Sequence, residues 1–214
     1  MMDTISIMKG DAHDPSTQLN DRIAQRVRDL RAARGMSLDA LATLCGVSRS
    51  MISLIERGES SPTAVVLDKL ATSLNVTLAS LFDAPQPTGE PVARLNDQVS
   101  WRDPHSGYVR RNVSPMFASS TAVSRVSSPI QIVEVSFPAK ARVSYETGAR
   151  EPLVHQQVWV LEGAIDVTVG DDLHRLTSGD CLALVLDRPV SFHNPTRKAA
   201  RYAAVIATLP SSAR

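Results

Sequence analysis

The sequence predicts two domains, an all-α domain of five short helices followed by an all-β domain. Apolar residues recur at helical spacing up to Phe82, whereas short β-rich runs follow from Val92 onward. Between the two patterns, residues 83–91 contain three prolines, which can neither continue a helix nor join the interior of a sheet. We therefore expect a disordered tail over 1–17, a helical domain over 18–82, a Pro-rich linker over 83–96 and a β domain over 97–210 with its core at 128–207.

The composition is that of an ordinary folded protein. The 214 residues are 43% hydrophobic and carry a formal net charge of +1. No apolar run approaches the roughly 20 residues that a membrane-spanning helix requires. The first 17 residues contain three aspartates and lack the basic start and apolar stretch of a secretory signal. We expect a cytoplasmic protein without a membrane partner, in which Cys45 and Cys181 stay reduced.

The first helix is predicted by apolar residues at steps of four and three, Ile23, Val27 and Leu30, and by a terminating glycine at Gly35. Its outward face carries five arginines: Arg22, Arg26, Arg28, Arg31 and Arg34. These arginines suit contact with DNA phosphates and an ordinary solvated surface equally well.

Two further short helices are separated by a tight turn. Ser37 is placed to cap a helix that ends at Gly46, and Ser48 is placed to cap the next one. Two short helices joined by a glycine-centred turn form a helix-turn-helix arrangement. A fourth helix opens at Pro62, and a fifth is expected over 77–82.

The third helix has two unlike sides. Met51, Ile52 and Ile55 are expected to face the core. The opposite, open side carries Arg49, Ser50, Ser53, Leu54 and Arg57. This side is the candidate recognition surface.

The helical half resembles the helix-turn-helix domain of the phage-repressor and XRE-type bacterial regulators. The resemblance spans residues 18–82 and rests on these segments: Leu38–Ala42, Gly46–Ser48, Ile52–Gly58, Ser61–Thr63 and Leu70–Ala71. It implies that the third helix enters the DNA major groove and that the start of the second helix rests on phosphate.

The residue chemistry agrees with that placement. The guanidinium of Arg49 fits two acceptors of guanine, Ser50 can donate or accept, and Leu54 can contact a thymine methyl. Arg57 and Ser37 suit phosphate. The predicted DNA contacts are Ser37, Ser48, Arg49, Ser50, Ser53, Leu54 and Arg57.

The helical domain carries eight basic and six acidic residues, a net charge of only +2. Its affinity for DNA of random sequence should therefore be modest. Glu56 is expected to accept hydrogen bonds inside the domain. We predict a homodimer that binds double-stranded DNA at a two-fold operator.

The second half contains short runs rich in β-branched and apolar residues, separated by turns at Gly163, 170–172 and 178–180. Closely spaced strands of this kind indicate an antiparallel sandwich or barrel. The order Val160–Gly163, Val167–Gly170, Gly179–Asp180 and Asn194–Pro195 resembles a cupin, a double-stranded β-helix barrel. Together the two halves resemble XRE-family regulators that carry a C-terminal cupin sensor.

The resemblance implies ligand positions that this sequence does not fill with metal ligands. Gln156 stands where metal-binding cupins have a glutamate, Val190 stands where they have the second-motif histidine, and residues 149–152 contain no histidine. His155 and His193 are each one residue out of register, which turns a strand side chain to the opposite face. We predict no metal, no cofactor and no catalytic residue, with an off-register site at these two histidines as the alternative.

Strand alternation predicts which side chains line the interior. If Gln156 and Val190 point inward, their neighbours two and four residues along do so as well. The predicted pocket residues are Arg142, Tyr145, Gln156, Val158, Val160, Val190, Phe192 and Asn194. This gives a largely apolar cavity with two amides, and the alternative is a barrel filled by its own side chains.

The function predicted from these features is sequence-specific DNA binding by a transcriptional regulator whose cupin domain senses an unidentified small-molecule effector, dimerises, or does both. Two other classes remain open. One is a cupin enzyme of isomerase or dioxygenase type tethered to DNA, which would need a metal. The other is an antitoxin-like interaction protein.

Overall fold

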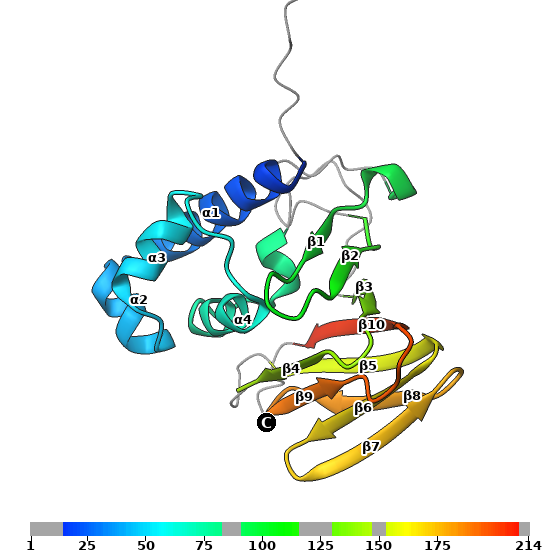
Figure 1. Ribbon diagram of the computed structural model, residues 1–214. Helices are drawn as coiled ribbons and strands as arrows, with labels where there is room; N and C mark the ends of the chain where they lie inside the picture. Colours follow the sequence, from blue (N-terminus) through cyan, green and yellow to red (C-terminus); the bar gives the residue numbers. More distant parts are fainter. Residues whose placement is uncertain (1–14, 83–90, 116–129, 147–152, 210–214) are drawn as a thin grey trace, which may run out of the picture.

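The computed structural model describes residues 15–82, 91–115, 130–146 and 153–209, and places a helical domain beside a β domain (Figure 1). The helical domain consists of α1 (Pro15–Ala33), α2 (Leu38–Cys45), α3 (Arg49–Glu56), α4 (Ala64–Ser73) and the 3-10 helix η1 (Ala79–Phe82). Helix α1 begins at Pro15, inside the segment expected to be a tail. Residues 1–14 of that tail and 83–90 of the expected linker lie outside the described residues.

The boundaries of α2 and α3 follow from side-chain capping. The hydroxyl of Ser37 accepts a hydrogen bond from the Ala40 amide at 3.0 Å, and the hydroxyl of Ser48 accepts one from the Met51 amide at 3.2 Å. Gly46 ends α2 with a φ of 66°, in the left-handed region that favours glycine. Both predicted N-caps are therefore confirmed.

The described part of the helical domain has four α-helices, and the fifth predicted helix is wrong in type. The segment 77–82 contains η1, in which the Ser80 amide donates to the Thr77 carbonyl and the Leu81 amide donates to the Leu78 carbonyl. Six residues are too few for successive α-helical bonds, so the segment closes with the tighter three-residue pattern.

The strands form two antiparallel sheets. The six-stranded sheet has the order β1-β2-β3-β10-β5-β8, and the four-stranded sheet has the order β4-β9-β6-β7. Their bounds are β1 (Ser100–Arg102), β2 (Val109–Asn112), β3 (Ile130–Phe137), β4 (Arg142–Tyr145), β5 (Leu153–Glu162), β6 (Ala164–Val169), β7 (Asp172–Thr177), β8 (Cys181–Val185), β9 (Val190–His193) and β10 (Ala200–Leu209), with a 3-10 turn η2 (Leu95–Asp97) before β1.

In the described residues this is a two-sheet sandwich, and the prediction of a closed barrel is wrong. The chain passes from one sheet to the other at the tight β5–β6 turn, where Gly163 has a φ of 80°. A Cβ at this position would lie 3.1 Å from the Ala199 carbonyl oxygen and the Ala200 Cα. The glycine turn thus allows the two sheets to pack face to face. Among the described strands, every hydrogen-bonded pair lies within one sheet or the other.

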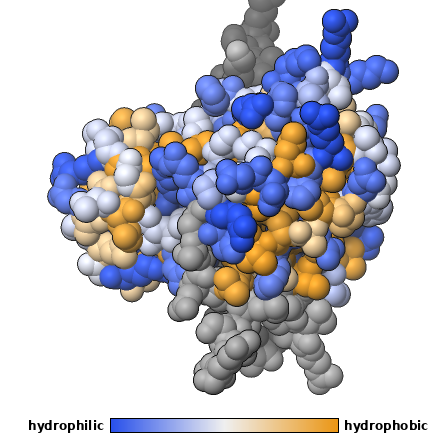
Figure 2. All heavy atoms as spheres, turned by 90° about the horizontal axis from the view of Figure 1, so that it is seen from below, coloured by the Kyte–Doolittle hydropathy of each residue, from blue (hydrophilic) through white to orange (hydrophobic). Residues whose placement is uncertain are grey.

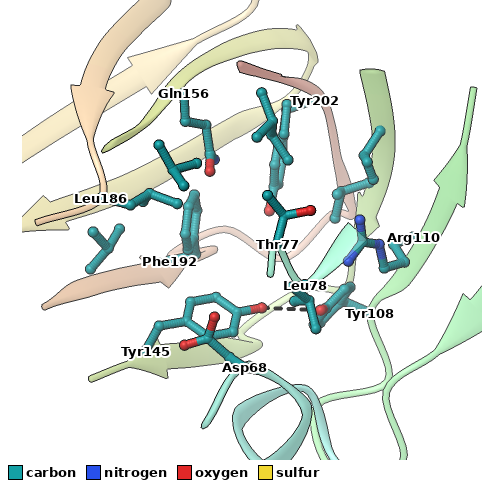
Figure 3. A pocket seen from close by; sticks show the side chains of 16 residues that line it. Asp68, Thr77, Leu78, Tyr108, Arg110, Tyr145, Gln156, Leu186, Phe192 and Tyr202 are labelled. Atoms are coloured by element: carbon teal, nitrogen blue, oxygen red, sulfur yellow. Dashed lines mark hydrogen bonds between the residues drawn. The ribbon is translucent and has the colours of Figure 1, made fainter. Parts of the chain in front are cut away.

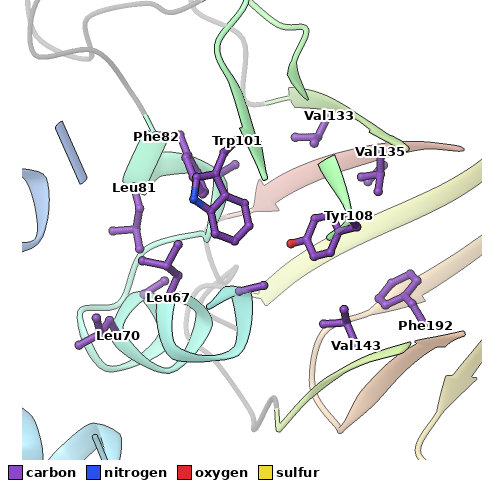
Figure 4. Packing of buried hydrophobic residues seen from close by; sticks show 14 of the residues in the cluster. Leu67, Leu70, Leu81, Phe82, Trp101, Tyr108, Val133, Val135, Val143 and Phe192 are labelled. Carbon is purple, nitrogen blue, oxygen red and sulfur yellow. The ribbon is translucent and has the colours of Figure 1, made fainter. Parts of the chain in front are cut away.

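The two domains share one hydrophobic core. Buried residues of α4 and η1, such as Leu67, Leu70 and Phe82, belong to the same cluster as Trp101 and Tyr108 of the β domain (Figure 4). Helix α4 is the helix that lies against the β domain, where it contacts β4. The domains are therefore joined by packing as well as by the chain between them.

Aromatic rings mark the junction. The sequence has nine aromatic residues. Seven of them form a continuous series of ring contacts with centroid distances of 5.4–6.3 Å, in the order Phe82, Trp101, Tyr108, Phe137, Tyr202, Phe192 and Tyr145. The series begins in the helical domain and ends inside the β sandwich. Such contacts add to the burial energy of each ring, so they favour one fixed arrangement of the domains.

Polar contacts fix the same junction. Asp103, which is buried between β1 and β2, accepts a hydrogen bond from the Ala64 amide at 2.8 Å. This carboxylate accepts a hydrogen bond from a backbone amide that has no partner within the first turn of α4. Its negative charge is stabilised there by the positive end of the helix dipole. Lys69 of α4 lies 3.1 Å from Glu146, and Thr77 donates to Gln131 at 3.2 Å.

Among the described residues, no single helix is long and apolar enough to cross a membrane. Only the pair α2 and α3 taken together reaches that length and composition, and the pair is bent by 115°.

Candidate DNA-binding surface and ligand cavity

Helix α3 presents a polar face that is held outward by its buried face. Ile52, Ile55 and Glu56 are buried in the helical domain. Arg49 and Ser50 are exposed, while Ser53 and Leu54 are half-buried. The expectation that Met51 faces the core is wrong, because 37% of its surface is exposed and its sulfur faces Ser60. Of the residues of this short helix, only Ile52, Ile55 and the last residue, Glu56, are buried.

Arg49 occupies the first turn of α3 and reaches outward. Its side chain is 63% exposed, and its Nε atom lies 3.2 Å from a carboxylate oxygen of Asp39. An exposed pair of this kind contributes little free energy. The guanidinium can therefore exchange Asp39 for a nucleic-acid acceptor at small cost.

Arg57, the C-cap of α3, is engaged more fully. Its guanidinium donates two hydrogen bonds of 2.8 Å to the Glu59 carboxylate and a third to the Ser53 hydroxyl. These hydrogen bonds lower the pKa of Glu59 and raise that of Arg57. A phosphate that binds Arg57 must displace or share this carboxylate.

The serines at the ends of α2 and α3 have local partners. Ser37 and Ser48 are the N-caps described above, and the Ser48 and Ser50 hydroxyls lie 3.2 Å apart. Each hydroxyl can form more than one hydrogen bond, so capping leaves capacity for DNA.

A cavity of about 90 Å³ lies where the two domains meet (Figure 3). The helical domain contributes Asp68 of α4 and, from the turn before η1, Thr77 and Leu78. The β domain contributes Tyr108, Arg110, Val133, Val135, Tyr145, Val154, Gln156, Leu186, Val190, Phe192, Tyr202, Ala204 and Ile206. The cavity is therefore a two-domain site, whereas the sequence predicted one inside the β domain alone.

The structure brings four of the predicted pocket residues together at this cavity: Tyr145, Gln156, Val190 and Phe192. Val158 and Val160 are buried in the core and are not part of the cavity lining. Arg142 lies exposed on β4, outside the lining.

Asn194 is fully buried but is occupied elsewhere. Its amide donates to the carbonyls of Phe137 and Lys198, and its oxygen accepts from the amide and hydroxyl of Thr196. These bonds hold the loop between β9 and β10, so the side chain is not available to a ligand.

The three tyrosines of the chain all line this cavity. Burial raises the pKa of Tyr108 to about 12 and raises the pKa values of Tyr145 and Tyr202 above their ordinary range. The hydroxyls of Tyr108 and Tyr145 are 3.0 Å apart. At neutral pH these groups act as neutral hydrogen-bond donors and acceptors, which suits binding better than proton abstraction.

The two histidines considered for an off-register metal site lie on different sheets. His155 is half-buried on β5, and His193 on β9 faces Asp166 at 3.8 Å. Within the described part of the chain, no group of three or more His, Cys, Asp or Glu side chains could hold a metal ion.

Comparison with known proteins identifies the first domain. Residues 27–81 match the helix-turn-helix family HTH_3. The chain carries a helix-turn-helix domain of this family. The match runs from within α1 to η1, so it includes both α2 and α3.

Several similar proteins extend beyond the helix-turn-helix domain. The HTH-type transcriptional regulator SutR of Escherichia coli is 28% identical over 77% of this chain and 83% of its own length. The regulator PuuR of the same organism is 26% identical over 79% and 86%. A crystal structure of an HTH_3 family transcriptional regulator from Vibrio cholerae aligns with a TM-score of 0.69 and 26% identity over 91% of this chain and 99% of that one. The combination of a helical and a β domain is thus shared with the Vibrio cholerae regulator along most of this chain.

Three residues, Glu56, Arg31 and Arg28, join α1 to α3 by hydrogen bonds that the sequence indicated only in part. Glu56 accepts two hydrogen bonds from the Arg31 guanidinium, at 2.6 and 2.8 Å, and Arg28 donates to the Glu56 carbonyl. The structural role expected of Glu56 is confirmed. The sequence did not predict that Arg31 is its partner, because α1 carries five arginines and the sequence gives no reason to prefer one of them.

Proposed function

We propose that the protein is a sequence-specific DNA-binding transcriptional regulator that reads the major groove with α3. The observation that carries this proposal is the exposed face of α3, where Arg49 and Ser50 point outward from a helix fixed by Ile52 and Ile55. Ser53 and Leu54 complete the face, while Arg57 and Ser37 are proposed to contact phosphate. The similar proteins named as transcriptional regulators support the same function.

The test is binding to an operator selected from genomic fragments with the full-length protein. Arg49→Ala should weaken operator binding by about 1–3 kcal/mol and relax the preference at one base pair of each half-site, because a guanine contact is lost. Arg57→Ala is the matched control. It should weaken operator and random DNA alike, because phosphate carries no sequence information. Equal weakening on both DNAs by Arg49→Ala would contradict base reading.

We also propose a homodimer, because one short helix with little net charge needs a second half-site for adequate affinity. The outer face of the six-stranded sheet is the proposed contact. On this face Val205 pairs with Ile132, and Ala203 pairs with Trp159. Trp159 is 49% exposed and Ile132 37%. The same face carries Glu134, Gln157 and Arg201, so the proposed contact combines an exposed tryptophan with polar side chains that can pair across a two-fold axis.

Figure 2 shows the molecule from below, where hydrophobic side chains gather over part of the β domain. The dimer proposal is tested with a matched pair of variants. Trp159→Glu should convert the dimer to a monomer in analytical ultracentrifugation, because it buries an unpaired charge in the contact. Leu173→Glu, at an equally exposed leucine of β7 in the other sheet, should leave the dimer intact. Dissociation by the second variant alone would place the contact on the four-stranded sheet.

The β domain is proposed to be a cupin-type binding module that senses a small molecule. Two observations support this role. Four of the predicted pocket residues line the cavity, and its tyrosine hydroxyls stay protonated at neutral pH, which suits binding better than acid-base catalysis. Gln156 and Val190, at the positions where the family resemblance implies metal ligands, both line it. A non-enzymatic role is consistent with the names of the similar regulators.

A further inference from the structure

The two helices of the helix-turn-helix are linked by an ion pair on their exposed side. Asp39 is the second residue of α2, and Arg49 is the first residue of α3. One carboxylate oxygen of Asp39 lies 3.2 Å from the Nε atom of Arg49. Leu41 of α2 and Ile52 of α3 belong to the same buried cluster, so the core of the domain sets the position of Asp39 beside α3.

The ion pair engages one nitrogen of the Arg49 guanidinium and leaves the other two. Within the described residues, the two Nη groups of Arg49 have no hydrogen-bond partner. Arg57 differs, because its Nε and one Nη bind Glu59 and its other Nη binds Ser53. Guanine offers two acceptors, O6 and N7, to a pair of N–H donors in the major groove. Arg49 can therefore bind both acceptors through its Nη groups while Asp39 stays at Nε.

Asp39 can order the Arg49 side chain for DNA binding. Both side chains are exposed in the free protein, at 63% for Arg49 and 74% for Asp39, so the pair contributes little to folding. In a DNA groove water leaves the pair, and the attraction between opposite charges grows as the surroundings become less polar. A long side chain also costs free energy when binding immobilises it. A carboxylate that holds Nε lowers this cost for the orientation in which the Nη groups reach a base.

The negative charge of Asp39 opposes general DNA binding. Contacts between cationic side chains and phosphate supply the affinity for DNA of any sequence, and a carboxylate on the same surface weakens it. Removal of this charge should therefore strengthen binding to every sequence, whereas loss of the ion pair should weaken the preference for one base. Asp39 also lies in the first turn of α2, where a carboxylate stabilises the helix. That role alone predicts lower stability and equal weakening on every DNA.

We propose that Asp39 is a positioning residue for base recognition. It holds the Nε atom of Arg49 so that the two Nη groups face O6 and N7 of one guanine in each half-site. This inference rests on the proposed function, in which Arg49 reads a base. It goes further by assigning part of the sequence preference to an acidic residue of α2, the helix whose start is otherwise expected to rest on phosphate.

The experiment measures binding of the full-length protein to three DNAs: the operator, the operator with the guanine pair read by Arg49 replaced, and random sequence. That guanine pair is the position at which Arg49→Ala loses its preference. Asp39→Asn should reduce the preference for the pair by about three- to tenfold, the cost of ordering one long side chain. The same variant should bind random DNA more tightly. Asp39→Glu keeps the charge and should retain most of the preference.

Two controls isolate the ion pair. Glu59→Gln breaks the matching pair at Arg57 and should raise the affinity for all three DNAs by the same factor, because Arg57 is proposed to contact phosphate. In the Arg49→Ala background, Asp39→Asn should cause no further change in base preference. Thermal unfolding of each variant measures any accompanying loss of stability.

Each contrary result has a separate meaning. An unchanged base preference in Asp39→Asn would overturn the inference. Equal weakening on all three DNAs, with a lower unfolding temperature, would assign Asp39 to helix stability and overturn it as well. A change of preference that persists in the Arg49→Ala background would show that Asp39 contacts a base itself and would overturn the positioning role. These three results leave base reading by Arg49 intact, whereas an Arg49→Ala variant that loses no preference would overturn both proposals.

Discussion

Helices α3 and α4 belong to one small domain but have opposite surroundings. Helix α3 buries one side against the domain and leaves Arg49 and Ser50 in solvent. Helix α4 is buried on both sides, by its own domain at Leu70 and by the β domain at Ala64, whose amide bonds Asp103. Helix α3 thus has an exposed face for the proposed DNA contact, and α4 connects the helical domain to the β domain.

Each of the two helices also buries one carboxylate, and the difference between them is instructive. Glu56 of α3 is bound by Arg31 within the helix-turn-helix domain, so its charge serves the stability of that domain alone. Asp68 of α4 lines the cavity shared with the β domain. The proposed DNA-reading helix α3 is thus held by contacts within its own domain, whereas α4 faces the cavity between the two domains through Asp68.

The largest effect is expected at the junction. Trp101 is buried between Phe82 and Tyr108. Trp101→Ala should lower the free energy of unfolding by about 3–5 kcal/mol, because a large core side chain leaves a cavity. The parent should unfold in one transition, and the variant should separate into two, measured by circular dichroism during denaturation.

The exposed Leu173 of β7 provides the control for this prediction. Leu173→Ala should change the free energy of unfolding by about 0.5 kcal/mol or less and leave a single transition. Two separate transitions in the parent protein would contradict a shared core and would make the two domains independent.

A smaller effect is expected within the helix-turn-helix domain. Glu56→Gln removes the charge that Arg31 binds and should lower the free energy of unfolding by about 1.5–3 kcal/mol, the value of a hydrogen bond to a charged group. Glu59→Gln, which breaks the solvent-exposed pair with Arg57, should leave stability nearly unchanged. Equal losses from both variants would remove the distinction between the internal and the surface pair.

The smallest effect concerns the three tyrosines that line the cavity, and it appears only at high pH. The ordinary pKa of tyrosine is 10.0, and burial raises that of Tyr108 to about 12. The folded protein therefore keeps phenol protons that the unfolded chain loses, so stability is full below pH 10 and falls as the pH rises through this interval. Tyrosinate absorbance should show no ionisation near pH 10 in the native protein and a normal titration after unfolding. A normal titration in the native protein would contradict the burial of this cluster.

The features that could be predicted from the sequence are those set by short-range chemistry. Ser37 and Ser48 can be predicted as caps because each stands directly before a helical run, and Glu56 can be predicted as an internal acceptor. The short segment 77–82 is predicted as an α-helix because its apolar residues have helical spacing, which does not reveal that six residues close with a tighter turn. Likewise, the resemblance to cupins places Gln156 and Val190 and strand alternation extends that placement to Asn194, but neither reveals that Asn194 is used by its own loop.

The helix-turn-helix domain and the polar face of α3 follow from the sequence alone, because caps, turn glycines and helical spacing act over a few residues. Contacts between distant parts of the chain place α4 on the β domain, bring Asp68, Thr77 and Leu78 to the cavity and arrange the strands in two sheets. These contacts join residues many positions apart. Asp68 and Arg110 meet one cavity because the shared core fixes how the domains pack, and no local pattern records that packing.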